Sequence, residues 1–563
     1  MPDAGTSTGS GSTETVTAAI VGRRRPPWRK LLSWLATACA AGLVWFALLA
    51  PNDLSLLSPT AFLRIPIEGL VLVALVLVLP LTGRRIVAVL VGVVLGVLTI
   101  VKITDMGFTA AFERPFDPIT DWGFLGPGVG VLRDSIGTFA ATVVVIAAGL
   151  LVIALLLLMP LSVVHLAGRV ARHRTGSARV VMTFGVGWTL CALVGVQLAP
   201  GTPVAASSAA GLTIDHVHQF QATLRDKGQT TAAAAAADPL RIAAGDQVLS
   251  GLRGKNVILA FVESYGRVAV QDSAFAPGIS AVLDAGTNEL RAAGFSAKSA
   301  FLTSPTFGGI SWLAHSTLQS GLWIDTQQRY NELMDSSRYT LTDAFKRGGW
   351  RTVADVPSNY SDWTEGTTFY HYDAIYDARN VGYEGPKFSY AAVPDQYSLA
   401  ALQHRELAGV HPPVMAEIDL VSSHTPWVPL PHLIDWNSVG DGSAFDSMPA
   451  QGQQPDDVWQ DVQLVQAAYA QSIEYSLKSI VSFVQTYGDD NLVVIMLGDH
   501  QPSSIISGGH ASHDVPVTLI AHDPAVLDRI SGWDWQDGLR PDPQAPVWQM
   551  DAFRDKFLTA YAM

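Results

Sequence analysis

Potential metal ligands stand directly after two apolar runs of the chain. The run NVILAFV at 256–262 is followed by Glu263. The run NLVVIML at 491–497 is followed, one glycine later, by Asp499 and His500. Two carboxylates and an imidazole supply the oxygen and nitrogen ligands that Zn²⁺ and Mn²⁺ accept. A single carboxylate in such a place is more typical of a helix N-cap, and a lone histidine of a surface residue, but two such strand ends together favour a metal site.

A serine suited to nucleophilic attack stands after a glycine-rich turn. Residues 304–321 read SPTFGGISWLAHSTLQSG, and Ser311 lies directly ahead of a predicted helix. The glycine pair lets the backbone approach a ligand closely. The N-terminus of the helix would stabilise an oxyanion that develops on an attacked phosphorus. Taken alone, Ser311 is more typical of an ordinary helix N-cap.

Three histidines lie where they could bind a phosphate or move a proton. His424 follows the apolar run 414–420 within SSHTPW, and His510 and His513 stand in GGHASHDVP. A histidine in such a place can donate to a phosphate oxygen, protonate a leaving group or bind a metal. A single histidine of this kind is more often structural, so the interpretation depends on the cluster as a whole.

The elements that must position these residues are those of an α/β domain. From residue 255 onward, apolar runs of strand length alternate with helical patterns such as 464–486. Such alternation predicts a largely parallel sheet, and ligands bind at the carboxyl ends of its strands. The polar residues named above stand at predicted strand ends of this kind.

The first 200 residues have a different character. Five apolar runs, each close to the length of about 20 residues that crosses a bilayer, predict five membrane spans. They lie near 31–50, 61–82, 86–104, 138–164 and 179–200. Arg64, Pro66 and Glu68 interrupt the start of the second run, and we expect Glu68 at the interface or at a polar site within the membrane.

Lysine and arginine gather in alternate segments between these runs. The basic segments are the cluster at 23–30, the turn at 84–85 and the loop at 169–179. The positive-inside rule makes these segments cytoplasmic, and five spans then place everything after residue 200 outside the membrane. We therefore expect a disordered, basic cytoplasmic tail over 1–30, a five-span domain over 31–200, a helical connector along the membrane over 201–250 and an extracytoplasmic catalytic domain over 251–563.

Composition excludes several classes of protein. The net charge of −13 on 563 residues argues against a nucleic-acid backbone as the partner, because such proteins carry basic stripes. Two cysteines, Cys39 and Cys191, are too few for a disulfide scaffold or a cysteine-rich metal site. Both fall within predicted membrane spans, so neither can serve the polar motifs described above.

In this order, the motifs resemble the sulfatase-like branch of the alkaline phosphatase superfamily, and the layout resembles the membrane-anchored lipoteichoic acid synthase group. The strand that ends at Glu263 is similar to that group's first metal-binding strand, and Gly498-Asp499-His500 is similar to its Asp-His metal pair. The segment around His424 is similar to the one that carries its substrate-binding histidine. The resemblance implies five spans ahead of an extracytoplasmic α/β domain with a central, largely parallel sheet.

The resemblance also implies a nucleophile. Sulfatases carry Cys or Ser in the pattern C/S-x-P-S-R, with a glycine ten residues further on, and Gly321 stands ten residues after Ser311. This chain departs from the pattern at the proline and has His315 at the arginine position, which argues against formylglycine and sulfate-ester hydrolysis. Ser311 is therefore expected to act as an unmodified hydroxyl. Thr306 is the alternative, because the lipoteichoic acid synthase group uses a threonine.

The activity that this resemblance implies is two-step transfer of a phosphoglycerol- or phosphoethanolamine-type group from a membrane phospholipid to a cell-envelope polymer or glycan. One divalent ion, Mn²⁺ or Zn²⁺ with Mg²⁺ also compatible, would be held by Glu263, Ser311, Asp499 and His500, and substrate by His424, His315 and His513. A sulfatase-like phosphodiesterase or other ester hydrolase would use the same residues. The non-enzymatic alternative is an inactive envelope-binding protein, and the oligomeric state stays open.

Overall fold

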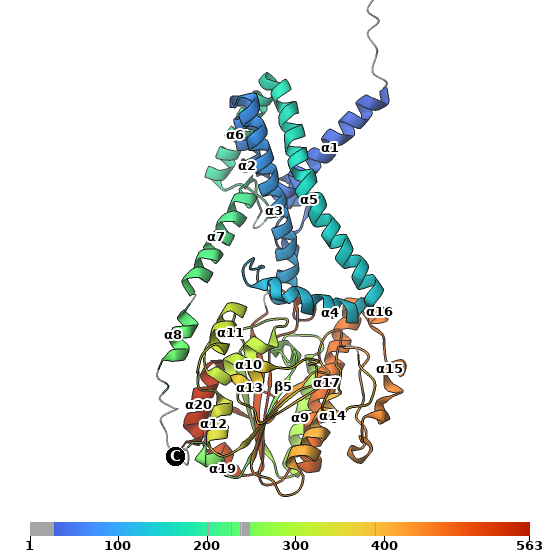
Figure 1. Ribbon diagram of the computed structural model, residues 1–563, viewed down its shortest axis with the longest axis vertical. Coiled ribbons are helices and arrows are strands. Elements are labelled where there is room, and N and C mark those ends of the chain that lie inside the picture. Colours follow the sequence, from blue (N-terminus) through green and yellow to red (C-terminus); the bar gives the residue numbers. More distant parts are fainter. Residues whose placement is uncertain are drawn as a thin grey trace, which may run out of the picture.

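The computed structural model describes residues 27–199, 202–226, 228–236, 238, 248–388, 390–509 and 511–562. Residues 1–26 of the predicted tail and His510 lie outside these residues, and residues 27–30 of that tail belong to a helix instead. The described chain forms a bundle of long helices and, beside it, an α/β domain (Figure 1).

Four helices in the described part of the chain are long and apolar enough to cross a membrane. They are α1 (Pro27–Leu49), α3 (Leu81–Phe112), α5 (Thr138–Arg172) and α6 (Arg174–Val194). Many of their Leu, Val, Ile and Phe side chains are exposed, as expected where hydrocarbon takes the place of water. The chain is thus a membrane protein with a soluble C-terminal domain.

The second predicted span, 61–82, is shorter than the sequence suggests. Its helix, α2 (Ile67–Val78), has 12 residues, whereas about 20 are needed to cross the hydrocarbon core. Pro66 precedes the helix, and Leu79 leaves the helical conformation because Pro80 follows it. The structure therefore has four helices of spanning length and one short apolar helix in the five predicted positions.

Polar side chains tie the connector to the membrane helices. The connector is helical, as predicted, but α7 (Ser208–Asp226) and α8 (Gln229–Ala235) run from the membrane helices toward the α/β domain (Figure 1). Glu68 in the first turn of α2 accepts a hydrogen bond of 2.9 Å from the backbone N–H of Ala210. His216 of α7 lies 3.1 Å from the buried carboxylate of Asp105 in α3.

The α/β domain is built on a nine-stranded sheet in the order β12-β6-β11-β10-β5-β9-β7-β8, with β13 paired to β6. The strands are β5 (Asn256–Val262), β6 (Ser296–Thr303), β7 (Arg351–Val356), β8 (Ala374–Asp377), β9 (Val414–Leu420), β10 (Leu492–Gly498), β11 (Asp514–Ala521), β12 (Gln536–Asp537) and β13 (Val547–Gln549). Among these strands only β11 and β12 run against the rest, so the sheet is largely parallel, as predicted. Short strands β1 (Ile65–Pro66) and β4 (Ala205–Ala206), and β2 (Gln197–Ala199) and β3 (Thr202–Pro203), pair near the membrane helices.

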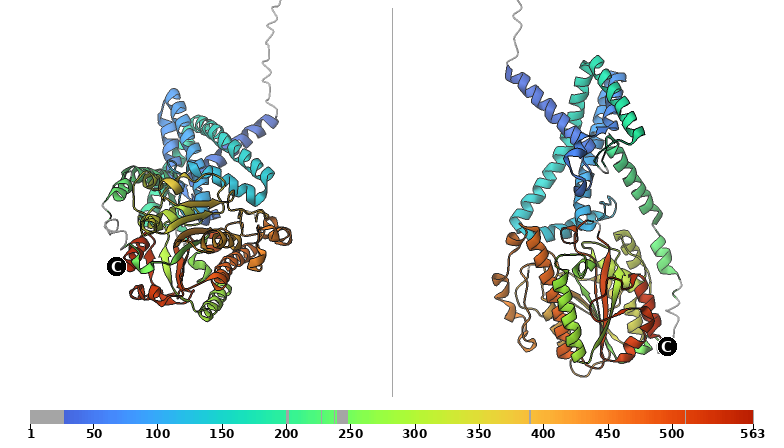
Figure 2. Two further views of the ribbon diagram at one scale, coloured as in Figure 1. Left: turned by 60° about the horizontal axis from the view of Figure 1, so that its bottom comes forward. Right: turned by 180° about the vertical axis from the view of Figure 1, so that it is seen from behind.

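Helices cover both faces of this sheet (Figure 2). One core contains Ile258, Ala260 and Val262 of β5, and the other contains the alternate residues of the same strand, because successive side chains of a strand point to opposite faces. The first core packs under α9 (Ala276–Ala292), α14 (Asp395–Leu402) and α17 (Val462–Tyr487), and the second under α10 (Ser311–Ser320), α12 (Leu341–Arg347), α19 (Pro524–Asp528) and α20 (Ala552–Tyr561). The other α-helices in the described part of the chain are α4 (Leu125–Ile136), α11 (Gln327–Met334), α13 (Thr364–Thr368), α15 (Met448–Gln451), α16 (Pro455–Val458) and α18 (Ser504–Ser507).

The carboxyl ends of the parallel strands face the end of α3. Ser504, which follows β10, donates a hydrogen bond of 2.7 Å to the carbonyl oxygen of Ala110 near the end of α3. Residues that leave the sheet at this edge therefore emerge beside a membrane helix (Figure 1).

Candidate active site

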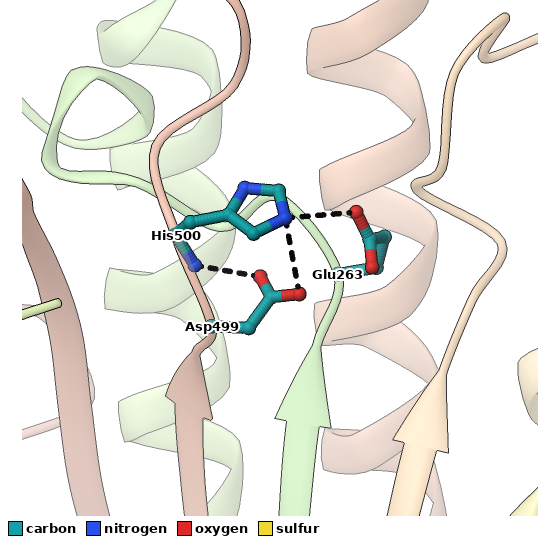
Figure 3. A group of neighbouring side chains, drawn as sticks. All are labelled: Glu263, Asp499 and His500. Carbon is teal, nitrogen blue, oxygen red and sulfur yellow. Dashed lines mark hydrogen bonds and ion pairs between the residues drawn. The ribbon is translucent and has the colours of Figure 1, made fainter. Parts of the chain in front are cut away.

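The three residues that the sequence predicts as metal ligands at strand ends lie together where β5 and β10 end (Figure 3). The two strands pair in parallel with Val262 opposite Gly498, so the residues that follow emerge side by side. One ligand atom from each of Glu263, Asp499 and His500 lies within 4.8 Å of the others. His500 Nε2 is 3.4 Å from Glu263 Oε1 and 3.4 Å from Asp499 Oδ2.

Backbone hydrogen bonds orient two of these side chains. Asp499 Oδ1 accepts hydrogen bonds of 2.8 Å from the backbone N–H groups of Ser264 and His500, which leaves Oδ2 directed at the His500 ring. His500 Nδ1 lies 2.8 Å from the carbonyl oxygen of Gln501. Because a carbonyl oxygen only accepts, Nδ1 carries a proton and donates it to Gln501, which turns Nε2 toward the two carboxylates. Metal-binding histidines are oriented by hydrogen bonds of this kind.

The electrostatics of the group fit a cation. Burial and, next, the neighbouring carboxylate of Glu263 together raise the pKa of Asp499 to about 6, although His500 acts in the opposite direction. A divalent ion between the two carboxylates would remove this repulsion and would repay the cost of burying their charge. Two carboxylates, an imidazole and a nearby hydroxyl form a donor set that suits Zn²⁺ or Mn²⁺.

Ser311 joins this group from α10. Its hydroxyl donates a hydrogen bond of 3.1 Å to Glu263 Oε2 and lies 3.2 Å from His500 Nε2. The N-cap of α10 is Ile310, not Ser311, so the N-cap interpretation of the serine is wrong. Ile310 has a φ of 69°, a left-handed conformation that is costly for a β-branched residue and that requires support from its surroundings. This turn directs the Ser311 hydroxyl at the predicted metal ligands.

Thr306, the alternative nucleophile, lies in a different environment. Its side chain is buried, and its hydroxyl is 3.4 Å from that of Ser304. Its backbone N–H also donates to the Ser304 hydroxyl, at 3.2 Å. The contacts of Thr306 are thus with its own turn, whereas those of Ser311 are with two candidate ligands.

His315 lies one helical turn beyond Ser311 and belongs to a second polar group. Its Nδ1 donates a hydrogen bond of 3.0 Å to Glu417 Oε1 and lies 3.6 Å from Asp419 Oδ1. Its ring stacks on Phe261, with centroids 3.6 Å apart. Burial alone lowers the pKa of His315, but Asp419, Glu417 and Asp499 together raise it to about 9. His315 therefore carries a positive charge at neutral pH, next to the candidate metal site.

Sequence reasoning missed Glu417 and Asp419. They stand two residues apart in β9, a segment read as simply apolar, and alternate residues of a strand point to the same face. Glu417 also accepts hydrogen bonds from Gln319 and, at 2.8 Å, from the hydroxyl of Tyr372. Charged residues at alternate positions in an otherwise apolar strand are the signal that could have revealed them.

The other two predicted substrate-binding histidines lie at the same sheet edge but touch other groups. The ring of His424 stacks on Tyr390, with centroids 3.5 Å apart, and its Nδ1 donates to the carbonyl oxygen of Thr425 at 2.6 Å. The backbone carbonyl of His513 accepts a hydrogen bond of 2.9 Å from Ser304, and its ring lies 5.4 Å from that of Phe307. Both follow or precede strands that flank β5 and β10.

No protein-family model and no curated protein matches the chain. Solved structures that it is similar to include the lipoteichoic acid synthase LtaP from Listeria monocytogenes, with 16% identity over 49% of this chain and 67% of that chain and a TM-score of 0.34. The phosphoglycerol transferase GacH from Streptococcus pyogenes has 13% identity over 59% of this chain and 91% of that chain, with a TM-score of 0.35. The phosphoethanolamine transferase EptA from Neisseria meningitidis, an integral membrane protein, has 12% identity over 93% of this chain and 95% of that chain, with a TM-score of 0.42. A protein of the alkaline phosphatase superfamily from Vibrio parahaemolyticus has 14% identity over 60% of this chain and 75% of that chain, with a TM-score of 0.34.

Proposed function

We propose that this chain is a membrane-anchored, metal-dependent transferase. It would move a phosphoglycerol- or phosphoethanolamine-type group from a phospholipid to a cell-envelope polymer or glycan through a covalent intermediate on Ser311. The observation that carries the proposal is the position of the Ser311 hydroxyl, within 3.2 Å of both Glu263 and His500. A nucleophile and charged or basic groups within hydrogen-bond reach form the arrangement that covalent catalysis requires.

In this proposal Glu263, Asp499, His500 and Ser311 hold one divalent ion, Mn²⁺ or Zn²⁺. When bound, such an ion lowers the pKa of a coordinated hydroxyl and neutralises charge on a phosphate. In the first step the Ser311 hydroxyl gives up its proton as a bond forms between Oγ and phosphorus, the bond from phosphorus to the diacylglycerol oxygen breaks, and the released alcohol takes up one proton in exchange. The second step reverses this sequence with the hydroxyl of the acceptor, or with water in a hydrolase.

The histidines have separate proposed roles. The charged ring of His315, held by Glu417, would attract a phosphate oxygen. His424, whose Nδ1 donates to the carbonyl oxygen of Thr425, would bind the phosphate or protonate the leaving oxygen. We assign His513 to substrate binding from its place beside the turn that precedes Ser311.

The proposal includes the membrane topology that the positive-inside rule predicts from the basic segments. The tail over 1–30 would be cytoplasmic, the membrane domain would extend to about residue 200, and the catalytic domain from about residue 251 would lie outside the membrane. Such an anchor keeps the site close to a surface where lipid head groups are concentrated.

The test uses the full-length protein in vesicles with a fluorescent phosphatidylglycerol or phosphatidylethanolamine and added Mn²⁺ or Zn²⁺. We expect release of diacylglycerol and, with lipid labelled in the head group, a covalent label on the protein. Ser311→Ala should abolish both, while Ser531→Ala, which removes an exposed serine elsewhere, should change neither. A label that persists on Ser311→Ala would overturn the nucleophile assignment, and product analysis with and without an acceptor glycan separates a transferase from a hydrolase.

A further inference from the structure

The end of membrane helix α3 packs directly on the turn that carries Ser311. A Cβ atom on Gly308 would collide with the carbonyl oxygen of Ala111, and one on Gly309 would lie 3.0 Å from the ring of Phe112. The two glycines thus allow α3 to approach the turn at backbone distance. A helix long enough to span a membrane therefore ends beside the candidate nucleophile.

Aromatic side chains continue from α3 to α10 without a break. We call this set the juxtamembrane aromatic cluster, and it consists of Phe108, Phe112, Phe116, Trp122, Phe124 and Trp312. Phe124 is its centre, with ring centroids 6.3 Å from Phe108, 6.2 Å from Phe112 and 5.8 Å from Trp312. Trp312 follows Ser311 directly, so the cluster reaches the residue next to the nucleophile.

The loop that carries half of this cluster is held in one shape. Arg114 donates hydrogen bonds of 2.7 and 2.9 Å to the two carboxylate oxygens of Asp121. The Asp121 side chain is buried and also accepts a hydrogen bond of 2.7 Å from the backbone N–H of Asp117. This pairing neutralises the loop's buried charge and orders it before any ligand binds, which lowers the entropy cost of binding.

Part of the cluster is left uncovered. Trp122 is 60% exposed and Trp312 is 37% exposed, and Ile119, in the same loop as Trp122, is 43% exposed. Tryptophans with one apolar face and one polar edge are typical of the interface between membrane and water. The cluster is thus partly uncovered at both ends, adjoins a membrane helix and includes the residue next to Ser311.

We infer that the juxtamembrane aromatic cluster binds the donor phospholipid at its glycerol backbone and first acyl carbons. The occupant must be apolar, must come from the membrane in which α3 lies and must carry a reactive group at Ser311, and a phospholipid meets all three conditions. Trp122, Phe124 and Trp312 then hold the diacylglycerol portion while the phosphodiester lies over the Ser311 hydroxyl. This inference rests on the proposed function, since it names the site for the donor of the same reaction.

The test compares two substrates of the full-length protein. One is fluorescent phosphatidylglycerol in vesicles, and the other is bis(p-nitrophenyl) phosphate, a soluble diester without acyl chains. We expect Phe124→Ala and Trp122→Ala to lower the ratio of the lipid rate to the soluble rate about tenfold each, as loss of an aromatic contact with the lipid predicts. Trp34→Ala, which removes a 70% exposed tryptophan from α1, is the matched control and should leave the ratio unchanged.

A second measurement does not depend on turnover. A phosphatidylglycerol with a photoactivatable group on its first acyl carbons should label peptides that contain residues 108–124 and 312 in the Ser311→Ala variant. Labelling elsewhere would overturn the inference, as would an equal fall of both rates, which would mean that the cluster only supports the Ser311 turn. Failure of the proposed function looks different, because the wild-type protein would then turn over neither substrate while the lipid still labelled the cluster.

Discussion

The hydroxyl of Ser311 donates a hydrogen bond of 3.1 Å to the carboxylate of Glu263, 48 residues earlier in the chain. One residue begins a helix and the other follows a strand, so the contact exists only when α10 is docked on the sheet edge. Because Ser311 makes this contact and Thr306 makes none of the kind, the two candidate nucleophiles can be separated by experiment.

We predict that Ser311→Ala lowers turnover by at least about a thousandfold, since it removes the proposed attacking atom. Ser311→Thr keeps a hydroxyl and should retain part of the rate. Thr306→Ser keeps the hydroxyl bonded to Ser304 and should stay within about threefold of wild type. Initial rates and head-group labelling of each variant provide the measurement. A large loss from Thr306→Ser together with a small loss from Ser311→Ala would reverse the assignment.

Metal content gives a second prediction. Glu263→Gln and Asp499→Asn each replace a charged ligand with a neutral amide, so the purified variants should bind less Mn²⁺ or Zn²⁺ than wild type. Ligand loss of this kind should cost at least about tenfold in metal affinity. Elemental analysis after dialysis measures this directly, and Asp528→Asn, an exposed substitution, is the control. Equal metal content in all four proteins would end the metal-site hypothesis.

The strand ends could be predicted from sequence because their signal is local. Continuous apolar runs such as 256–262 identify buried strands. The polar residue that follows each parallel strand must then lie at the carboxyl edge of the sheet. Ser311 was proposed from the resemblance to the sulfatase pattern, in which a glycine such as Gly321 follows the nucleophile by ten residues. Glu417 was missed because the apolar residues around it dominate the pattern of β9.

Features that depend on distant contacts or on chain breaks were harder to predict. The run 61–82 has the hydropathy of a span, but hydropathy counts apolar residues and gives no weight to Pro66 and Pro80, which limit α2 to 12 residues. The contact between Ala111 and Gly308 joins residues far apart in the chain, and neither local sequence carries a pattern that predicts it.

Gly308 gives a third prediction. Gly308→Ala places a methyl group against the carbonyl oxygen of Ala111 at a φ of 70°, so it should displace the Ser311 turn and lower turnover more than about tenfold. Gly349→Ala is the matched control, because Gly349 also has a positive φ, of 96°, but faces open space. Gly349→Ala should lower the free energy of unfolding by only about 1 kcal/mol, the cost of a left-handed backbone conformation for alanine, and should leave turnover unchanged. Equal effects from the two substitutions would show that the contact with α3 is unimportant.

Asp395 gives a prediction of pH dependence. Burial raises its pKa to about 6, although hydrogen bonds from Ser476 and Ser422 act in the opposite direction. The folded protein then holds this proton more tightly than the unfolded chain between about pH 4 and pH 6, so the free energy of unfolding falls as the pH rises through that window. At about 1.4 kcal/mol per pKa unit, the fall amounts to about 3 kcal/mol.

Asp395→Asn should remove this fall, because the amide cannot ionise and can still accept from the backbone N–H of Ser422. The measurement is the thermal unfolding temperature of detergent-solubilised protein from pH 4 to pH 7. Asp528→Asn again serves as the exposed control and should keep the wild-type slope. If the unfolding temperature of Asp395→Asn fell with pH as steeply as that of the wild type, the prediction would be wrong.

The pair of His315 and Glu417 gives a fifth prediction. Since the pKa of His315 is raised to about 9, its charge stabilises the fold below about pH 6.5, and this contribution is lost as the pH rises through about 9. Glu417→Gln removes the partner of a buried charge and should destabilise the protein by about 3 kcal/mol at pH 7. The double variant His315→Gln with Glu417→Gln should lose less free energy of unfolding than the sum of the losses in the two single variants. Additive losses in thermal unfolding would mean that the two side chains do not interact.

The hydrogen bond from the backbone of Ser264 to Asp499 joins residues 235 positions apart. During synthesis, β5 leaves the ribosome long before β10, and until β10 arrives the carboxylate of Glu263 has no partner strand beside it. The complete ligand set therefore cannot form on a nascent chain, even one whose helices already lie in the bilayer among abundant lipids. Under the proposed function, chemistry on the lipid therefore cannot begin until the 235 positions from Ser264 to Asp499 have been synthesised, so the order of synthesis itself delays the activity.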